Sequence, residues 1–174
     1  FISLTTLLWR DLLMGIAFQK TTLVLAFGLC ASSAFANTLD LCSEADLMVG
    51  TKVVGKARYA AQNCQASWQN QSIEMQFHYT EKIPGWAFKR AAHHFLSKNL
   101  KGDIGFFDPI SNAYQSIQSG DRYALFYRHN SQTLSLSLNG QTLSRLQHPK
   151  AQQYFNIWLG EQPFSVKLKQ QLLN

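Results

Sequence analysis

The chain has 174 residues, of which 46% are hydrophobic and 15% charged, and its formal net charge at pH 7 is +6. It lacks a dense run of Lys and Arg with interleaved aromatic residues, which argues against nucleic acid as a partner. The modest basic excess permits weak peripheral contact with anionic lipid, but it also describes many ordinary soluble proteins.

The first 36 residues have the pattern of an export signal. Met14 precedes Lys20, an apolar run at 23–29 and small residues that end at Ala36. This order is that of a secretory signal, so we expect a signal peptide at 14–36 with cleavage after Ala36. Residues 1–13 are interpreted as translated sequence upstream of the protein. Leu29 before Cys30 is a poor lipoprotein processing site, which favours free release into the periplasm or the medium.

Removal of residues 1–36 leaves 138 residues, enough for one domain with a single core at 37–174. The net charge then falls from +6 to +5, because Arg10, Lys20 and Asp11 are removed. No linker, repeat or low-complexity segment interrupts this part of the chain, and we expect it to be a monomer.

Two cysteines remain in the predicted domain, Cys42 and Cys64. In an oxidising compartment they most simply form a disulfide, which would stabilise the fold by roughly 3 kcal/mol. The alternative is that both are small buried hydrophobic residues. Their spacing matches neither a zinc motif nor a redox C-x-x-C site, and adjacent His93 and His94 make a poor metal pair on a helix. We therefore propose neither a metal site nor a cofactor.

In chain order, the pattern predicts irregular strands at 47–54 and 58–68 and a clear strand at Ile73–Tyr79. A helix follows Pro84-Gly85. Its apolar stripe consists of Phe88, Ala91, Ala92, Phe95, Leu96 and Leu100; its polar stripe consists of Lys89, Arg90, His93, His94, Ser97, Lys98 and Lys101. The polar stripe is either a solvated outer face or a surface for anionic lipid or an acidic partner.

A shorter helix is predicted near Asp108-Pro109, with Ile110, Ala113, Tyr114 and Ile117 on one side. Strands at Arg122–Arg128, Thr133–Leu138 and 141–146 then form a meander, with Asn139-Gly140 as a tight hairpin turn. Behind Pro149 one helix carries Ala151, Tyr154, Phe155, Trp158 and Leu159 and stops at Gly160. Ser165 caps a last helix with Leu168, Leu172 and Leu173. The fold class is α+β, an antiparallel sheet with helices packed on one face.

Four pieces of the C-terminal third stand in a characteristic order: Gly120-Asp121-Arg122, Leu138-Asn139-Gly140, the segment 154–159 and the leucines of 168–173. In their order and spacing these pieces resemble the end of the bacterial chalcone-isomerase-like family. The resemblance implies the open-faced β-sandwich of that family, in agreement with the fold class derived from the residue pattern.

The enzymes that this family resembles use an arginine and a threonine on early strands to cyclise a phenolate. Here the comparable place, Gly50-Thr51-Lys52-Val53, offers Lys52 and no arginine, and no catalytic threonine can be placed. A point-charge lysine does not replace the planar, two-pronged donor of arginine. In relatives the following strand often carries a Val-Tyr-Asp-Ala run. The corresponding segment here is Gln62-Asn63-Cys64-Gln65-Ala66, which lacks the tyrosine and the aspartate. No catalytic residue is therefore carried over.

Three functions are compatible with these features. The leading hypothesis is an exported, non-catalytic protein that binds a fatty acid or similar amphipathic carboxylate in the cleft between sheet and helices, as non-enzymatic relatives of the fold do. Candidate ligand-binding residues are Lys52, Arg58, Phe77, Tyr79, Tyr123 and Tyr127, as cations for the carboxylate and aromatic walls. The alternatives are an isomerase or lyase acting on a phenolic or enone-like compound, and an envelope interaction module without a small ligand.

Overall fold

The computed structural model describes residues 38–174. The predicted signal peptide with its cleavage site at Ala36, and the interpretation of residues 1–13, lie outside the described residues. Among residues 38–174, no helix is both long enough and apolar enough to span a bilayer.

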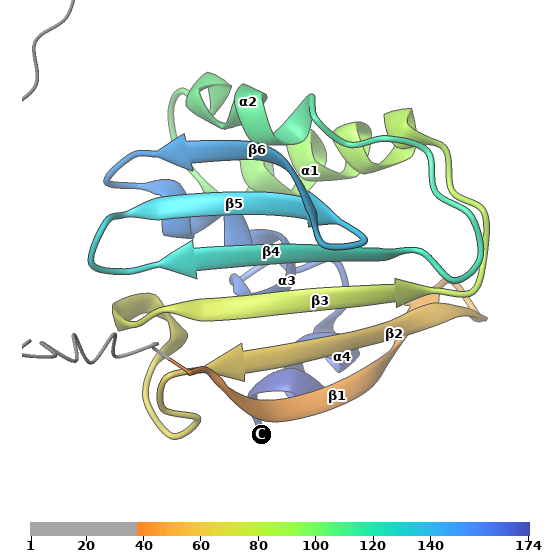
Figure 1. Cartoon of the computed structure of the whole chain (residues 1–174), viewed down its shortest axis with the longest axis horizontal. Coiled ribbons are helices and arrows are strands. Elements are labelled where there is room, and N and C mark those ends of the chain that lie inside the picture. Colours follow the sequence, from red (N-terminus) through yellow and green to blue (C-terminus); the bar gives the residue numbers. More distant parts are fainter. Residues whose placement is uncertain (1–37) are drawn as a thin grey trace, which may run out of the picture. The chain divides into compact units, whose positions relative to one another are not determined.

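Within residues 38–174, six strands form one antiparallel sheet (Figure 1). The strands follow one another in chain order: β1 (Asp40–Val49), β2 (Lys52–Ala61), β3 (Ile73–Tyr79), β4 (Arg122–Arg128), β5 (Thr133–Leu138) and β6 (Gln141–Gln147). Each strand therefore pairs with its neighbours in sequence. The predicted strands at Ile73–Tyr79, Arg122–Arg128 and Thr133–Leu138 are confirmed, and β6 extends one residue beyond the predicted 141–146.

Helices cover one face of this sheet (Figure 1). They are α1 (Gly85–Asn99), α2 (Asp108–Ser111), α3 (Asn156–Leu159) and α4 (Val166–Leu173), joined by the short 3₁₀ segments η1 (Trp68–Asn70), η2 (Gly105–Phe107) and η3 (Ala151–Phe155). The predicted α+β class, an antiparallel sheet with helices on one face, is confirmed.

Strict alternation of side chains decides which face of the sheet is covered. In β3, Ile73, Met75, Phe77 and Tyr79 are buried, whereas the residues between them are only half-buried. The register continues this division, since Met75 lies opposite Tyr59 of β2 and Leu125 of β4, both buried. The face of the sheet that carries these residues packs against the helices and forms the core, and the other face is the open side of the sandwich.

The predicted boundaries of the first two strands are wrong. Residues 47–54 do not form one strand, because the turn at Gly50-Thr51 divides this stretch between β1 and β2. Gly50 has φ = +60°, a conformation that glycine adopts without strain. The predicted strand 58–68 ends at Ala61, and the slot Gln62–Ala66 lies in the loop that follows β2.

The region behind Pro149 also differs from the prediction of one continuous helix. Residues Ala151–Phe155 form a 3₁₀ segment, and α3 begins only at Asn156. The side-chain amide of Gln152 donates hydrogen bonds to the backbone oxygens of Trp68 and Gln71, which tie this segment to the turn before β3. The helix ends at Gly160, and Ser165 caps α4 by accepting a hydrogen bond from the N–H of Leu168 at 3.2 Å, both as predicted.

Trp158 is partly buried and packs on Phe77 of β3, with ring centroids 4.8 Å apart. The neighbouring Ile157 and Leu159 are the more deeply buried residues of α3. Gly160 is required by space rather than by its φ, because a Cβ there would lie 2.5 Å from Oδ1 of Asn99 and 2.6 Å from the backbone oxygen of Asn156.

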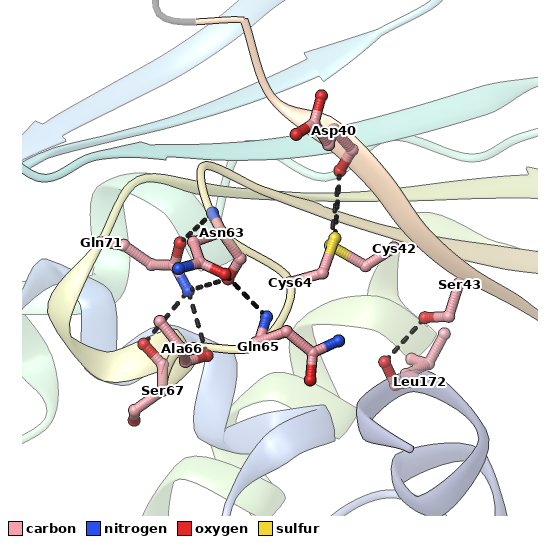
Figure 2. The surroundings of a disulfide bond; sticks show 10 residues. All are labelled: Asp40, Cys42, Ser43, Asn63, Cys64, Gln65, Ala66, Ser67, Gln71 and Leu172. Carbon is pink, nitrogen blue, oxygen red and sulfur yellow. Dashed lines mark hydrogen bonds between the residues drawn. A yellow bond between two sulfur atoms is a disulfide. The ribbon is translucent and has the colours of Figure 1, made fainter.

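A disulfide joins Cys42 of β1 to Cys64 in the loop after β2, with 5.3 Å between the two Cα atoms (Figure 2). The predicted pairing is confirmed. The loop itself is organised by Gln71, whose amide nitrogen donates to the backbone oxygens of Asn63, Ala66 and Ser67. The amide oxygen of Gln71 accepts from the N–H of Asn63 at 2.7 Å. This start of the β1–β2 hairpin is therefore held by a covalent bond and by the hydrogen bonds of the buried Gln71 side chain.

Candidate functional site

A largely apolar cavity of about 410 Å³ lies at the end of the sheet where β1 turns into β2. The apolar walls come from the hairpin, from the loop before α1, from α1 itself and from the segment before α4: Leu47, Val49, Val54, Ile83, Ala87, Phe88, Ala91 and Phe164. Four polar residues, Lys52, Tyr79, Glu81 and Lys82, complete the lining. A cavity of this size and composition is typical of sites for small apolar or amphipathic molecules.

The backbone at this end of the sheet has two unusual positions. Gly50 forms the turn, and Gly55 adopts φ = +157° where β2 meets β3. A Cβ on Gly55 would lie 2.0 Å from the backbone oxygen of His78, so only glycine allows the two strands to approach here. Next to it the register of β1 on β2 shifts between Leu47 and Met48. This irregularity bends the hairpin and orients Leu47 and Val54 toward the cavity.

The rim of the cavity carries a small excess of positive charge. Nζ of Lys52 lies 3.0 Å from Oε1 of Glu81; the Lys52 side chain is 64% exposed and that of Glu81 38%. Lys82, also in the lining, is exposed and forms no salt bridge among residues 38–174. The two lysines and one glutamate leave one net positive charge at the mouth of an otherwise apolar cavity.

An aromatic cluster forms the wall of the cavity that faces the core. The ring of Tyr79 contacts Phe88 edge-on at 5.6 Å and Tyr123 at 6.3 Å. Tyr114 stacks on Phe88 at 5.2 Å and meets Tyr123 edge-on at 5.0 Å. Such edge-to-face and stacked pairs fix the rings relative to one another, so this wall is rigid.

The tyrosine hydroxyls of this wall are neutral at physiological pH. Burial raises the pKa of Tyr79 above its ordinary value, and the nearby Tyr123 adds to the effect. Burial likewise raises the pKa of Tyr114 well above its ordinary value. The Tyr123 hydroxyl donates to the backbone oxygen of Gln115 at 2.9 Å and accepts from the Gln115 N–H at 2.8 Å. Because their protons are held firmly, none of these groups is suited to act as a base.

The six residues proposed from the sequence as ligand-binding do not all lie together. Lys52 and Tyr79 line the cavity. Tyr123 and Phe77 do not line the cavity but contact the ring of Tyr79, with Phe77 at a ring-centroid distance of 6.4 Å. Together these four residues come from β2, β3 and β4.

The remaining two residues lie elsewhere. Tyr127 pairs with Ile73 at the other end of β3, in the core. Arg58 alternates with the buried Ala57 and Tyr59 and so faces the open side of the sheet, where its Nε donates to the carboxylate of Glu44. Neither residue is brought to the cavity.

Ten of the twelve lining residues were not proposed from the sequence, among them Glu81, Lys82, Phe88 and Phe164. Phe88 was identified as part of the apolar stripe of a helix, and this stripe was the only signal available. Phe164 precedes α4 and contacts Phe95 of α1 at a ring distance of 5.6 Å, a long-range contact that no local pattern reveals.

A second depression, of about 460 Å³, lies on the open face of the sheet and is polar. Hydroxyl groups of β5 and β6, Arg128 and Arg145 line it around the ring of Phe126, over which the Arg128 guanidinium is placed at 5.6 Å. The sheet separates it from the apolar cavity. Among residues 38–174, no group of three or more His, Cys, Asp or Glu side chains is arranged to hold a metal ion.

Comparisons with known proteins agree with this architecture. A crystal structure of a fatty-acid binding protein from Arabidopsis thaliana superposes with a TM-score of 0.58 and 13% sequence identity, over 78% of this chain and 86% of that one. Among curated proteins, none matches the chain in sequence. The sequence profile described as chalcone isomerase-like matches residues 55–174, more than half of the chain. The chain therefore belongs to the chalcone isomerase-like family.

Proposed function

We propose that the protein binds a long-chain fatty acid, or a similar amphipathic carboxylate, in the cavity between the β1–β2 hairpin and α1. The observation that carries the proposal is the combination of apolar walls with a net positive rim. Eight of the twelve lining residues are apolar, and Lys52 and Lys82 stand among the four polar ones. An acyl chain is favoured by burial against such walls, and a carboxylate is favoured beside the lysines.

In the proposed arrangement the acyl chain enters beside Val54 and Phe88 and ends against the rigid aromatic wall. The carboxylate stays at the rim, where Lys82 meets it directly and Lys52 exchanges part of its contact with Glu81 for the ligand. Keeping the carboxylate at the rim avoids the cost of burying an unpaired charge.

The structural comparison supports this ligand class. A protein of the same fold is named for fatty-acid binding, although the 13% identity makes the fold the only feature that the comparison itself establishes. The cavity of this chain, with its own lysines and apolar walls, supplies the independent argument.

Binding without catalysis is the form of the function that the site favours. Lys52 is paired with Glu81, the Tyr123 hydroxyl is occupied by backbone groups, and burial holds the Tyr79 proton in place. Chalcone cyclisation requires donors aligned with a developing enolate, and apart from Tyr79 the polar residues of the lining are Lys52, Glu81 and Lys82 at the rim.

We further propose that the protein acts in the periplasm or outside the cell. Disulfides such as that between Cys42 and Cys64 form and persist in oxidising compartments, which supports this location. The signal-like order at 14–36 supports export as a separate argument from sequence. N-terminal sequencing of the protein recovered from its own cells tests this, because export with cleavage after Ala36 gives Asn37 as the first residue.

Calorimetric titration with oleate tests the binding proposal. Lys82→Met and Lys52→Met should each weaken binding by about fivefold, the effect of one solvent-exposed charge contact. Arg58→Met, which removes an equal charge from the opposite face of the sheet, should leave the affinity unchanged. Equal losses for Lys82→Met and Arg58→Met would show that net charge, and not this rim, attracts the fatty acid.

Occlusion of the cavity gives a larger effect. Ala91→Trp should abolish oleate binding by filling the space beside Phe88, whereas Ser97→Trp places the same side chain on the exposed side of the same helix and should not. On the same preparations, absorbance should show chalcone cyclisation at the spontaneous rate. Saturable turnover that Ala91→Trp removes would establish an enzyme instead.

A further inference from the structure

The outer face of α1 is rich in basic residues and carries an exposed tryptophan, although packing of the fold requires neither. Ala92 and Leu96 are buried against the sheet, and Phe88 and Phe95 are partly buried beside them. The opposite side of the helix is exposed along its whole length. We define the basic face of α1 as the exposed residues Trp86, Lys89, Arg90, His93, His94 and Ser97.

The segment that contains this face is basic and has no acidic residue of its own. Between residues 82 and 102 the chain contains five Lys or Arg residues, Lys82, Lys89, Arg90, Lys98 and Lys101, and neither Asp nor Glu. Among residues 38–174, the salt bridges are formed by Lys52, Lys56 and Arg58, and none by these five cations. Lys98 is placed over the ring of Phe95 at 5.7 Å, which leaves its ammonium group at the surface. The charge of the segment is therefore available to an anionic partner.

Trp86 adds an apolar element to the same face. Its side chain is 66% exposed, the most of any large hydrophobic residue between 38 and 174. Lys89, Arg90 and His93 follow Trp86 at three, four and seven residues, so all four lie on one side of the helix. An exposed tryptophan next to cations is typical of a segment that lies in the headgroup region of a bilayer, where the ring is partly buried and its N–H stays solvated.

We propose that the basic face of α1 docks on an anionic lipid bilayer. The helix of fifteen residues is about 22 Å long, and it carries Trp86 in its first turn, Lys89 and Arg90 in its second and Lys98 in its last, which suits a plane of phosphate groups better than a single acidic site. Trp86 inserts into the headgroup region at the start of the helix. Ala87 and Ala91 on the flank of α1 line the cavity, so docking brings its mouth near the lipid from which a fatty acid would come.

Vesicle flotation with two matched double variants tests this. The vesicles contain phosphatidylcholine with about one-third phosphatidylglycerol and no free fatty acid, so the result does not depend on the proposed function. Lys89→Gln/Arg90→Gln removes two cations from the basic face. Arg128→Gln/Arg145→Gln removes two exposed cations from the open face of the sheet. Both are made in the full chain, so any contribution of residues 1–37 to binding is common to both.

The first pair should weaken partitioning by about 25-fold, because each Lys or Arg near an anionic surface contributes about fivefold. The second pair should change it by less than about twofold. Trp86→Ala should also weaken binding. Vesicles of phosphatidylcholine alone should bind the parent chain and its variants much more weakly than the anionic vesicles bind the parent chain. Equal losses for both pairs, or no loss for the first pair, would overturn the proposal. Unchanged melting curves of these surface variants would exclude misfolding as the cause.

Discussion

The two ends of the β1–β2 hairpin are built in opposite ways. Where β1 begins, the disulfide from Cys42 and the Gln71 network fix the loop after β2, and the Ser43 hydroxyl donates to the backbone oxygen of Leu172 at 2.7 Å (Figure 2). Where β1 turns into β2, the exposed Val49 and Val53 flank a glycine turn beside the cavity.

We interpret this difference as a division of roles within the β1–β2 hairpin: the disulfide end stabilises the two strands, and the turn end forms the cavity. An edge hairpin that leaves apolar side chains exposed at its turn loses the burial that would otherwise hold it. Here the cross-links at the opposite end hold the same two strands. We infer that the fixed end allows the turn end to stay open for a ligand, and the following variants test this division, from the largest expected effect to the smallest.

Gly55→Ala should be the most damaging change in the hairpin. The added Cβ would meet the backbone oxygen of His78, and the φ of +157° disfavours any side chain, so we expect a loss of about 3–5 kcal/mol in the free energy of unfolding. Gly50→Ala is the matched control, because no atom lies within 4 Å of its Cβ and only the φ of +60° costs about 1 kcal/mol. Denaturant unfolding measures both, and equal losses would contradict the close approach of β2 and β3.

Removal of the disulfide should affect stability and spare binding. The double variant Cys42→Ser/Cys64→Ser releases a loop of 22 residues, and we expect it to lose roughly 3 kcal/mol in oxidised samples. Because the cavity is at the other end of the hairpin, oleate affinity under stabilising conditions should stay within about twofold of the parent. A loss of affinity as large as the loss of stability would break the proposed separation of the two ends.

Gln71→Ala should cost about 2 kcal/mol, less than the disulfide. Its side chain is 6% exposed and forms four hydrogen bonds within the loop, whose backbone partners would lose them. Gln69→Ala, at an exposed position of the same loop, should change stability by less than about 0.5 kcal/mol. Similar values for the two variants would show that the loop is held by the disulfide alone.

The smallest effect is expected on the open face of the sheet. Hydrogen bonds from Lys56 and Arg58 lower the pKa of Glu44 to about 2 from an ordinary value of 4.5. Because the folded-state pKa is lowered, the stabilisation is present above pH 4.5 and is lost as the pH falls toward 2. Glu44→Gln should therefore reduce the fall of the melting temperature between pH 4.5 and pH 2, whereas the matched variant Glu161→Gln should leave that fall unchanged. An unchanged acid profile in Glu44→Gln would show that the exposed pair contributes nothing measurable.

The regular part of the fold could be predicted from the sequence because its alternation is strict. In β3 every second residue from Ile73 to Tyr79 is apolar, and Asn139-Gly140 is an unambiguous turn signal. The predicted boundaries of the first two strands were wrong for a physical reason. Register shifts after Leu41 and after Leu47 break the two-residue period of β1, and Gly50-Thr51 is a weaker turn signal than Asn-Gly.

The cavity could be predicted only in part. Lys52 and Tyr79 were named because a cation and an aromatic hydroxyl suit a carboxylate ligand, and both line it. The pattern could not separate Arg58 from Lys52, since the bulge near Gly55 changes which residues of β2 face the helices. The contribution of Phe164 depends on how the segment before α4 packs on α1, a long-range contact without a local signal.

The central claim is that a fatty acid occupies the cavity at the turn end of the hairpin, and methyl NMR during an oleate titration tests it most directly. The account predicts saturable shifts for methyl groups of Leu47, Val54 and Ala91, which line the cavity. Leu134 and Leu136 of β5, buried away from it, should not shift. Saturable shifts confined to Thr133 and Thr142 in the polar depression of the open face, or the absence of saturable shifts, would contradict it.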